Sequence, residues 1–190
     1  MPAAAILRSA RTARGLSQRD LAAATGIAQP TIAIIETTGR DTTIDHLDEL
    51  LRALGHSVAS LPTILPSVGD WAATLRRDRV LDPGAIRTVL VQMADDLATV
   101  DPATRVALCA ASPGRTGDRT VDALLAGLVE HLLREDDLPV PLWVDDADRI
   151  AETEWDFVTN AALVGLARAN TPEPFRRRNV FVPAEALESV

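Results

Sequence analysis

The sequence contains no lysine and no tyrosine, and it is poor in cysteine and in aromatic residues. Its single cysteine, Cys109, excludes an intrachain disulfide and a zinc site built from several cysteines. With three tryptophans and three phenylalanines in 190 residues, the core has to be built mainly from Ala, Leu, Val and Ile. Hydrophobic residues nevertheless make up 47% of the chain, which is typical of a folded protein rather than a disordered one.

Long apolar runs are also missing. No stretch approaches the roughly 18 apolar residues that a membrane-spanning helix needs. The apolar stretch from Pro2 to Leu7 is too short for the hydrophobic region of a signal peptide. We therefore expect a cytoplasmic protein with no membrane contact, folded as one domain or as two small ones.

The residue patterns of common enzymes are absent too. The three histidines are scattered without metal-ligand spacing, and neither a Walker loop nor a dinucleotide-binding glycine pattern occurs. Cys109 lies in an apolar helical segment, where a small buried side chain is expected rather than a nucleophile. Adjacent acids such as Asp95-Asp96 are typical of a solvated face. We predict that the protein is not an enzyme and that it has no catalytic residue, no metal and no cofactor.

Charge is unevenly distributed along the chain. The net charge of −8 argues against non-specific nucleic-acid binding by the whole surface. Residues 1–19 nevertheless carry four arginines and no acid, whereas residues 122–157 carry eleven acids and two arginines. The sequence therefore indicates a basic N-terminal tip and an acidic body.

Hydrophobic spacing is helical almost throughout and no run alternates like a strand, which predicts an all-α protein. Residues 1–55 contain four short helical patterns and form the first predicted domain, residues 56–67 read as a linker with two prolines, and residues 68–190 form a helical second domain. Residues 136–145 are expected to be extended because Pro139 and Pro141 block a helix. The predicted helices lie near 4–14, 17–25, 28–37, 43–54, 68–79, 83–98, 102–111, 119–135 and 157–169.

The most informative segment is 16–39, which reads as a short helix, a turn at Gly26 and a second helix. In a helix-turn-helix of this kind the second helix lies in the major groove of DNA. Ala22 and Ala23 are small enough for the two helices to cross closely. The apolar residues expected to anchor the second helix to the core are Ile27, Ile32 and Ile35.

Residues 6–55 resemble the Cro/phage-repressor (Xre) helix-turn-helix family. The resemblance implies a lambda-repressor-like domain of four to five helices that binds double-stranded operator DNA as a homodimer and regulates transcription. Glu36 is implied to be structural, holding its helix end to a neighbouring arginine. The residues that carry the resemblance are Ser17-Gln18, Leu21-Ala22, Gly26, Ile32, Ile35-Glu36, Gly39 and Leu54-Gly55.

The same resemblance assigns roles at the DNA. Gln18 would bond a phosphate, and Gln29, which opens the recognition helix, would reach adenine with its amide. Thr31 would contact a phosphate or a base. The remaining candidates are Ala33 and Ile34, which would face thymine methyl groups, and Arg19 and Arg40, which would neutralise phosphates.

This sequence departs from the family pattern at several positions. Ala28 stands where a capping hydroxyl is common, Pro30 replaces a possible base-contacting side chain, and Gly39 comes one place late. The predicted reading surface is therefore poor in hydrogen-bond donors. We expect modest sequence specificity that relies on DNA shape and dimer spacing.

The layout of the whole chain, an Xre-type head joined to an unrelated helical body, resembles Xre-type antitoxins that sit beside a putative nucleotidyltransferase toxin. This predicts that the acidic body neutralises a basic toxin encoded by a neighbouring gene. Two alternative functions remain open: a stand-alone repressor that senses a small ligand, and an interaction module that has lost DNA binding. The candidate partner-binding residues are Trp143, Asp145, Asp146, Phe175, Arg176 and Arg177.

Two plainer interpretations compete with these partner assignments. Segment 138–143 would then cross the body's own core, and the arginine triplet 176–178 would be a solvated turn that pairs with the acidic body.

Overall fold

The computed structural model describes residues 3–38, 42–77 and 82–187. The chain divides into two compact units, Met1–Pro62 and Thr63–Val190, and each has a hydrophobic core of its own. The division falls inside the segment that the sequence marks as a linker. The first unit also includes the start of this segment, because the Val58 amide donates to Asp48 Oδ1 at 2.9 Å.

The described residues of the N-terminal unit form four short helices. They are α1 (Ala3–Ala13), α2 (Gln18–Thr25), α3 (Gln29–Thr38) and α4 (Ile44–Ala53), close to the bounds that the sequence predicts. Both α3 and α4 pack against α1 and α2 in this unit. The side chains of its core are Leu7, Ala10, Leu21, Ile32, Ile35, Leu47, Leu50, Leu51 and Leu54.

Local sequence signals determine where these helices begin and end. Ser17 and Asp20 form a capping box at the start of α2, in which each side chain accepts from the other residue's backbone N–H. Gly26 ends α2 in the left-handed region at φ 72°, which a glycine adopts without steric cost. Thr43 caps α4 by accepting from the His46 amide at 3.2 Å.

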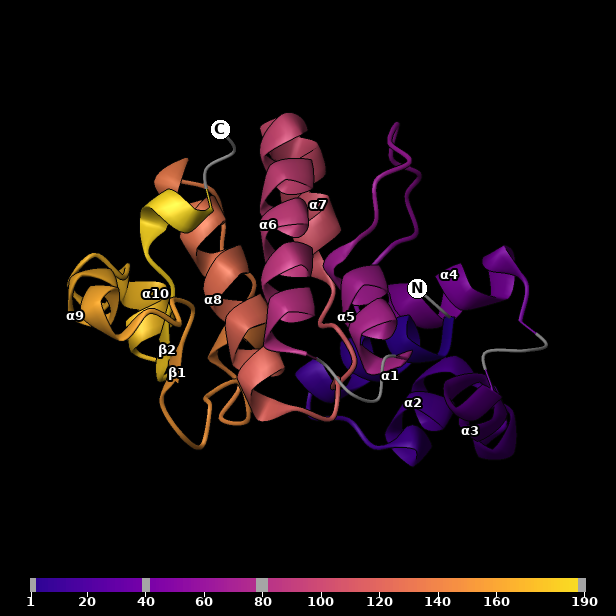
Figure 1. Cartoon of the computed structure of the whole chain (residues 1–190). Helices are drawn as coiled ribbons and strands as arrows, with labels where there is room; N and C mark the ends of the chain where they lie inside the picture. The colour runs from indigo at the N-terminus through magenta and orange to yellow at the C-terminus, as the bar shows by residue number, and fades with distance from the viewer. Residues whose placement is uncertain (1–2, 39–41, 78–81, 188–190) are drawn as a thin grey trace. The chain divides into compact units, whose positions relative to one another are not determined.

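The C-terminal unit is built around one buried helix. Helix α8 (Arg119–Glu135) packs against α6 (Pro83–Thr99), beside which it runs in Figure 1. Every residue of α8 from Val121 to His131 is buried. The other helical elements of this unit are α5 (Val68–Arg77), α7 (Pro102–Ala110), η1 (Leu142–Asp145), α9 (Ala161–Ala169), α10 (Glu173–Arg176) and η2 (Ala184–Ala186).

The structure corrects the sequence prediction in two places. Two short parallel strands, β1 (Trp155–Asp156) and β2 (Val180–Phe181), pair Trp155 with Val180. Two-residue strands are too short to show an alternating pattern. Phe157 continues this pairing through its backbone N–H, so the helix expected from 157 begins only at Ala161.

The second correction concerns the proline-rich segment 136–145. Its last four residues form the 3₁₀ turn η1 rather than extended chain. Pro141 blocks a helix at its own position but supplies the backbone geometry from which a helical turn can start.

Candidate nucleic-acid interface

Helices α2 and α3 form the predicted helix-turn-helix. Ile32 and Ile35 are buried and Ile27 is partly buried, so these isoleucines anchor α3 to the core as expected. The outward face of α3 carries Thr31 and Ile34, of which Ile34 is half exposed. Ala22 packs against the core, as the close crossing of the two helices requires. Ala23 does not, because the turn of the helix directs it to solvent, so the prediction for Ala23 was wrong.

A chain of side-chain hydrogen bonds links the first residues of the two helices to α1. We call Gln29, Gln18, Glu36 and Arg11 the glutamine relay. Gln29 Nε2 donates to Gln18 Oε1 at 2.8 Å, and Gln18 Nε2 donates to Glu36 Oε2 at 2.9 Å. Arg11 holds the far end, donating to both oxygens of Glu36 at 2.7 and 2.9 Å. The recognition helix is thereby fastened to α2 and α1 by polar bonds as well as by its core face.

Glu36 is the buried centre of this relay, with 3% of its surface exposed. Burial opposes ionisation, but hydrogen bonds from Arg11 and Gln18 and the positive charges of Arg11 and Arg8 outweigh it and hold the pKa of Glu36 below its ordinary value. The hydrogen bond to Glu36 likewise raises the pKa of Arg11. Glu36 is thus a charged structural residue, in agreement with the role that the family resemblance implies.

The relay determines what the two glutamines can offer to DNA. A side-chain amide has two N–H donors and one carbonyl acceptor. Gln29 uses one N–H on Gln18 and keeps one donor and its Oε1 acceptor, which is the pair that adenine requires in the major groove. Gln18 uses its carbonyl and one N–H, so one N–H remains for a phosphate.

Sequence reasoning assigned Gln18 to phosphate and missed its second role as the residue that positions Gln29. The signal was present, since each glutamine is the first residue of its helix and the two helices meet at a tight turn. The hydrogen bond between the two glutamines could be recognised only from the tertiary contact between α2 and α3.

The other predicted DNA contacts are placed less specifically. Arg19 lies exposed in the first turn of α2, and Thr31 is exposed in the first turn of α3. Ala33 is partly buried, and Arg40 lies outside the described residues. Arg8 adds a further half-exposed cation, which donates to the Glu36 backbone carbonyl at 2.8 Å. The reading surface is as poor in donors as the sequence predicts.

In the C-terminal unit, two predicted partner contacts are core residues. Trp143 is 6% exposed and donates through Nε1 to the Cys109 carbonyl at 2.9 Å. Phe175 is fully buried against Gly127 of α8. A chain this poor in aromatic residues uses them to fill its interior, so neither ring is on the surface for a partner. The alternative, in which the segment around Trp143 crosses the core, is the one that the structure supports.

The acidic segment is largely neutralised by arginines. Glu130, fully buried on α8, binds Arg178 at 2.5 Å and also pairs with Arg177 and Arg134. The nine of its eleven acids that lie within 4.0 Å of an arginine nitrogen are Asp122, Glu130, Asp136, Asp145, Asp146, Asp148, Glu152, Glu154 and Asp156. The carboxylates of this segment are therefore compensated locally, although residues 63–190 as a whole contain 21 acids and 13 arginines and remain acidic.

The arginine triplet takes part in this neutralisation. Arg177 pairs with Asp145 at 2.6 Å as well as with Glu130. Arg176 is exposed and donates to the Thr171 carbonyl at 2.6 Å. The third residue, Arg178, is buried, so the turn pairs with the acidic body but is not fully solvated.

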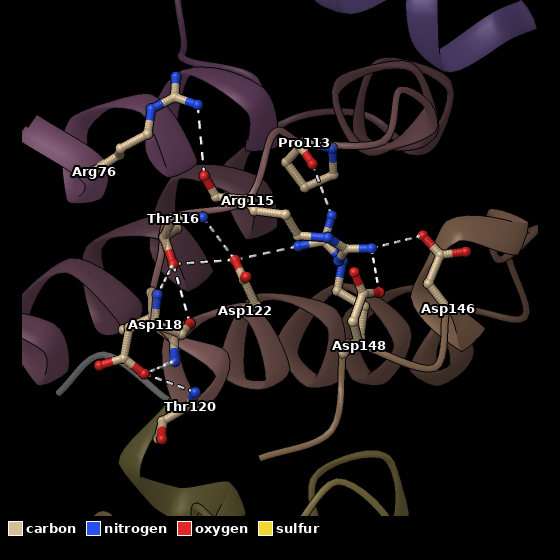
Figure 2. Close-up of polar contacts among 11 residues, drawn as sticks. Arg76, Pro113, Arg115, Thr116, Asp118, Thr120, Asp122, Asp146 and Asp148 are labelled. Carbon is tan, nitrogen blue, oxygen red and sulfur yellow. Dashed lines mark hydrogen bonds and ion pairs between the residues drawn. The ribbon is translucent and has the colours of Figure 1, made fainter. Parts of the chain in front are cut away.

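A second arginine cluster fixes the loop before α8 (Figure 2). Buried Arg149 donates to the Pro113 carbonyl at 2.7 Å and lies 3.4 Å from Asp122 Oδ1. Burial, together with the nearby charge of Arg115, lowers the pKa of Arg149 to about 10, so it stays protonated at neutral pH. Arg115 itself pairs with Asp146 and Asp148. The cluster is a structural clamp between the loop and the segment after η1.

The single cysteine is a core side chain. Cys109 is fully buried, and burial raises the pKa of its thiol to about 12, so the thiol stays protonated at neutral pH. Among the residues that the structure places, no three histidine, cysteine or acidic side chains are grouped to hold a metal ion. Within the same residues, no helix is both long and apolar enough to cross a membrane.

Comparison with known proteins gives one match. A protein-family model described as helix-turn-helix matches residues 7–61, which cover all but the start of α1, the whole of α2 to α4, and the chain that follows. No curated protein and no solved structure matches the chain. The match coincides with the N-terminal unit that contains the glutamine relay.

Proposed function

We propose that this chain, a DNA-binding transcription regulator with a Cro/phage-repressor helix-turn-helix domain at residues 7–61, binds its operator as a homodimer and neutralises a toxin encoded by a neighbouring gene. The observation that supports specific DNA reading is the bond from Gln29 to Gln18, which leaves Gln29 with the donor and acceptor that adenine needs. The scarcity of other donors on α3 favours an operator read partly by its shape.

A footprint of the promoter of its own operon tests the DNA part of this proposal. Two protected half-sites with centres about 34 Å, or one helical turn, apart are expected for a dimer. A single protected half-site would contradict the dimer. Absence of protection at any promoter region of the operon would favour the alternative in which the domain has lost DNA binding.

The antitoxin part rests on the C-terminal unit. This unit has its own core and presents α9 as an exposed apolar helix, with Leu163 49% and Leu166 63% exposed. Arg168, the single charged residue of α9, is folded back onto Asp156 at 2.7 Å. Exposed apolar patches mark interaction surfaces in many proteins. Because arginines neutralise most of the acidic segment, α9 supports a partner contact better than the charge of that segment does.

Co-expression with the product of the neighbouring gene tests the toxin partner. The full chain should copurify with that product and rescue growth, and the Gln29→Ala protein should rescue equally because its defect is confined to DNA. Leu163→Ser with Leu166→Ser should reduce rescue, whereas Ile44→Ser, at a more exposed apolar site (73%) in the other unit, should not. If the full chain neither copurifies with that product nor rescues growth, the toxin-binding part of the proposal is wrong, and transcriptional repression alone remains.

A further inference from the structure

Two arginines of α1 share one carboxylate in the N-terminal unit. Arg11 Nε lies 2.7 Å from Glu36 Oε1, and Arg8 Nε lies 3.9 Å from Glu36 Oε2. The side chains of Glu36 and Arg11 are 1% and 12% exposed, whereas that of Arg8 is 57% exposed. The three side chains together carry one surplus positive charge, and Arg8 is the member that presents it to solvent.

The recognition helix fixes the position of Arg8. Its Nη2 donates to the Glu36 carbonyl at 2.8 Å, and this carbonyl is one of the last four of α3, which have no partner within the helix. A cation at this place also offsets the partial negative charge of the helix end. Within the described residues, the guanidinium uses one of its five N–H groups in this way, so other N–H groups remain for an anion.

Arg8 lies close to Gln18, the predicted phosphate contact at the start of α2. Gln18 Nε2 and Arg8 Nε approach the same oxygen, Glu36 Oε2, at 2.9 and 3.9 Å, so the two nitrogens are at most 6.8 Å apart. DNA carries one negative charge per about 1.7 Å of its axis. A phosphate beside the one that Gln18 bonds is therefore within reach of the Arg8 guanidinium.

We propose that Arg8 is a further contact to the DNA backbone, binding a phosphate beside the one that Gln18 bonds. This inference rests on the proposed DNA binding and adds a contact that the family resemblance did not assign. Residues 1–62 contain six arginines and six acids, so the unit has no net charge with which to attract DNA. Its affinity for the backbone therefore depends on single exposed arginines, of which Arg8 is held at the end of the recognition helix.

The salt dependence of DNA binding tests this contact. Fluorescence anisotropy of a labelled duplex from the promoter of its own operon, titrated with the full chain at several salt concentrations, gives the slope of log K against log[salt]. Arg8→Gln should make this slope shallower by about 0.9 unit, the value for one phosphate contact. Arg8→Lys, which keeps the charge, should retain the slope of the parent protein.

Arg14→Gln is the matched control. Arg14 is an exposed arginine just after α1, and it likewise donates to a carbonyl at a helix end, that of Leu54 after α4, at 2.9 Å. Its replacement should leave the slope unchanged. If Arg8 served only to hold α3, Arg8→Gln would lower affinity and shift the amide resonances of α3 without changing the slope, because the slope counts released counterions.

The outcomes separate this contact from the proposed DNA binding itself. An unchanged slope for Arg8→Gln, a shallower slope for Arg8→Lys, or an equal change for Arg14→Gln would overturn the assignment of Arg8 and leave DNA binding standing. If the parent protein does not bind the promoter duplex at any salt concentration, the proposed DNA binding is wrong, and the Arg8 contact is wrong with it.

Discussion

Gln29 donates its side-chain amide to Gln18 at 2.8 Å, so the first residue of α3 is held by the first residue of α2. Because Gln18 is itself bonded to Glu36 and Glu36 to Arg11, the reading side chain is oriented before DNA arrives. Orientation in advance lowers the entropy that is lost on binding.

The first prediction is that the two glutamines act as a unit. Gln29→Ala should cost about 1–3 kcal/mol on the operator and relax base preference. Gln18→Ala should cost part of the same energy, because it frees Gln29 to rotate. In a double-mutant cycle measured by fluorescence anisotropy, the coupling should reach about 0.5 kcal/mol or more. Additive losses would show that the relay does not contribute to reading.

Arg19 should contribute to DNA affinity without contributing to sequence preference. Its side chain is exposed in the first turn of α2 and is expected to neutralise a phosphate. Arg19→Ala should weaken binding to all sequences and reduce the salt slope of log K by about one unit. Arg52→Ala, at an exposed arginine that pairs with Asp48 at the end of α4, is the control and should leave the slope unchanged. An equal change of the salt slope in both variants would contradict a specific phosphate contact by Arg19.

The stability of the N-terminal unit should fall in acid through Glu36. Its pKa is below the ordinary value in the folded protein, so its contribution is complete above the unfolded pKa and is lost as the pH falls through the folded one. Glu36→Gln should lower stability at pH 6, and its difference from the parent protein should shrink as the pH falls below the ordinary glutamate pKa of about 4.3. Residues 1–62 contain no tryptophan, tyrosine or phenylalanine, so the stability of this unit has to be followed by its amide resonances rather than by fluorescence. A difference that does not shrink at any acidic pH at which the parent protein stays folded would contradict the ionic role.

The linker should be cut between the two units. Val58 and Ile64 are exposed, and no arginine lies between Arg52 and Arg76. Limited thermolysin digestion, which cleaves before apolar residues, should therefore release two folded fragments, whereas trypsin should not cut this segment. If thermolysin yields no discrete fragments, the two-domain interpretation fails.

Two glycines on helices of the C-terminal unit should respond oppositely to the same change. A Cβ on Gly127 would lie 2.7 Å from Phe175 Cδ1, whereas one on Gly165 would meet nothing within 4 Å. Gly127→Ala should lower the free energy of unfolding by about 1–2 kcal/mol through overpacking, and Gly165→Ala should raise it by up to about 1 kcal/mol through helix propensity. Urea unfolding followed by tryptophan fluorescence measures both changes. A stabilised Gly127→Ala protein would contradict the tight packing of Phe175.

The parts of the fold that local chemistry determines could be predicted from the sequence. Helix α8 has the predicted bounds, and the Asp-Pro pairs before α6 and α7 mark their starts, because caps and periodicity act over a few residues. The pairing of Trp155 with Val180 could not be predicted, since it joins residues far apart in the chain through very short strands.

The charge of the acidic segment was also misjudged, because its ion pairs join residues that are far apart in the chain. A count along residues 122–157 shows an acidic surface, but the arginines that neutralise it come from other parts of the chain, including Arg105, Arg115, Arg168 and Arg177. The DNA residues were placed through family resemblance, and the structure adds what resemblance alone did not show, the orientation of Gln29 by Gln18.

The pairing of buried Glu130 with Arg177 and Arg178 has a consequence for how the protein is made. These arginines follow Glu130 by 47 and 48 residues, and Phe175, which covers Gly127, precedes them by only a few positions. During synthesis, α8 therefore leaves the ribosome with Glu130 paired to Arg134 but without its two later arginine partners, and with an unfilled groove. The N-terminal unit can fold early and reach DNA, but the C-terminal unit has to wait for residues 175–178, so the DNA-binding activity of a nascent chain precedes any activity of its body.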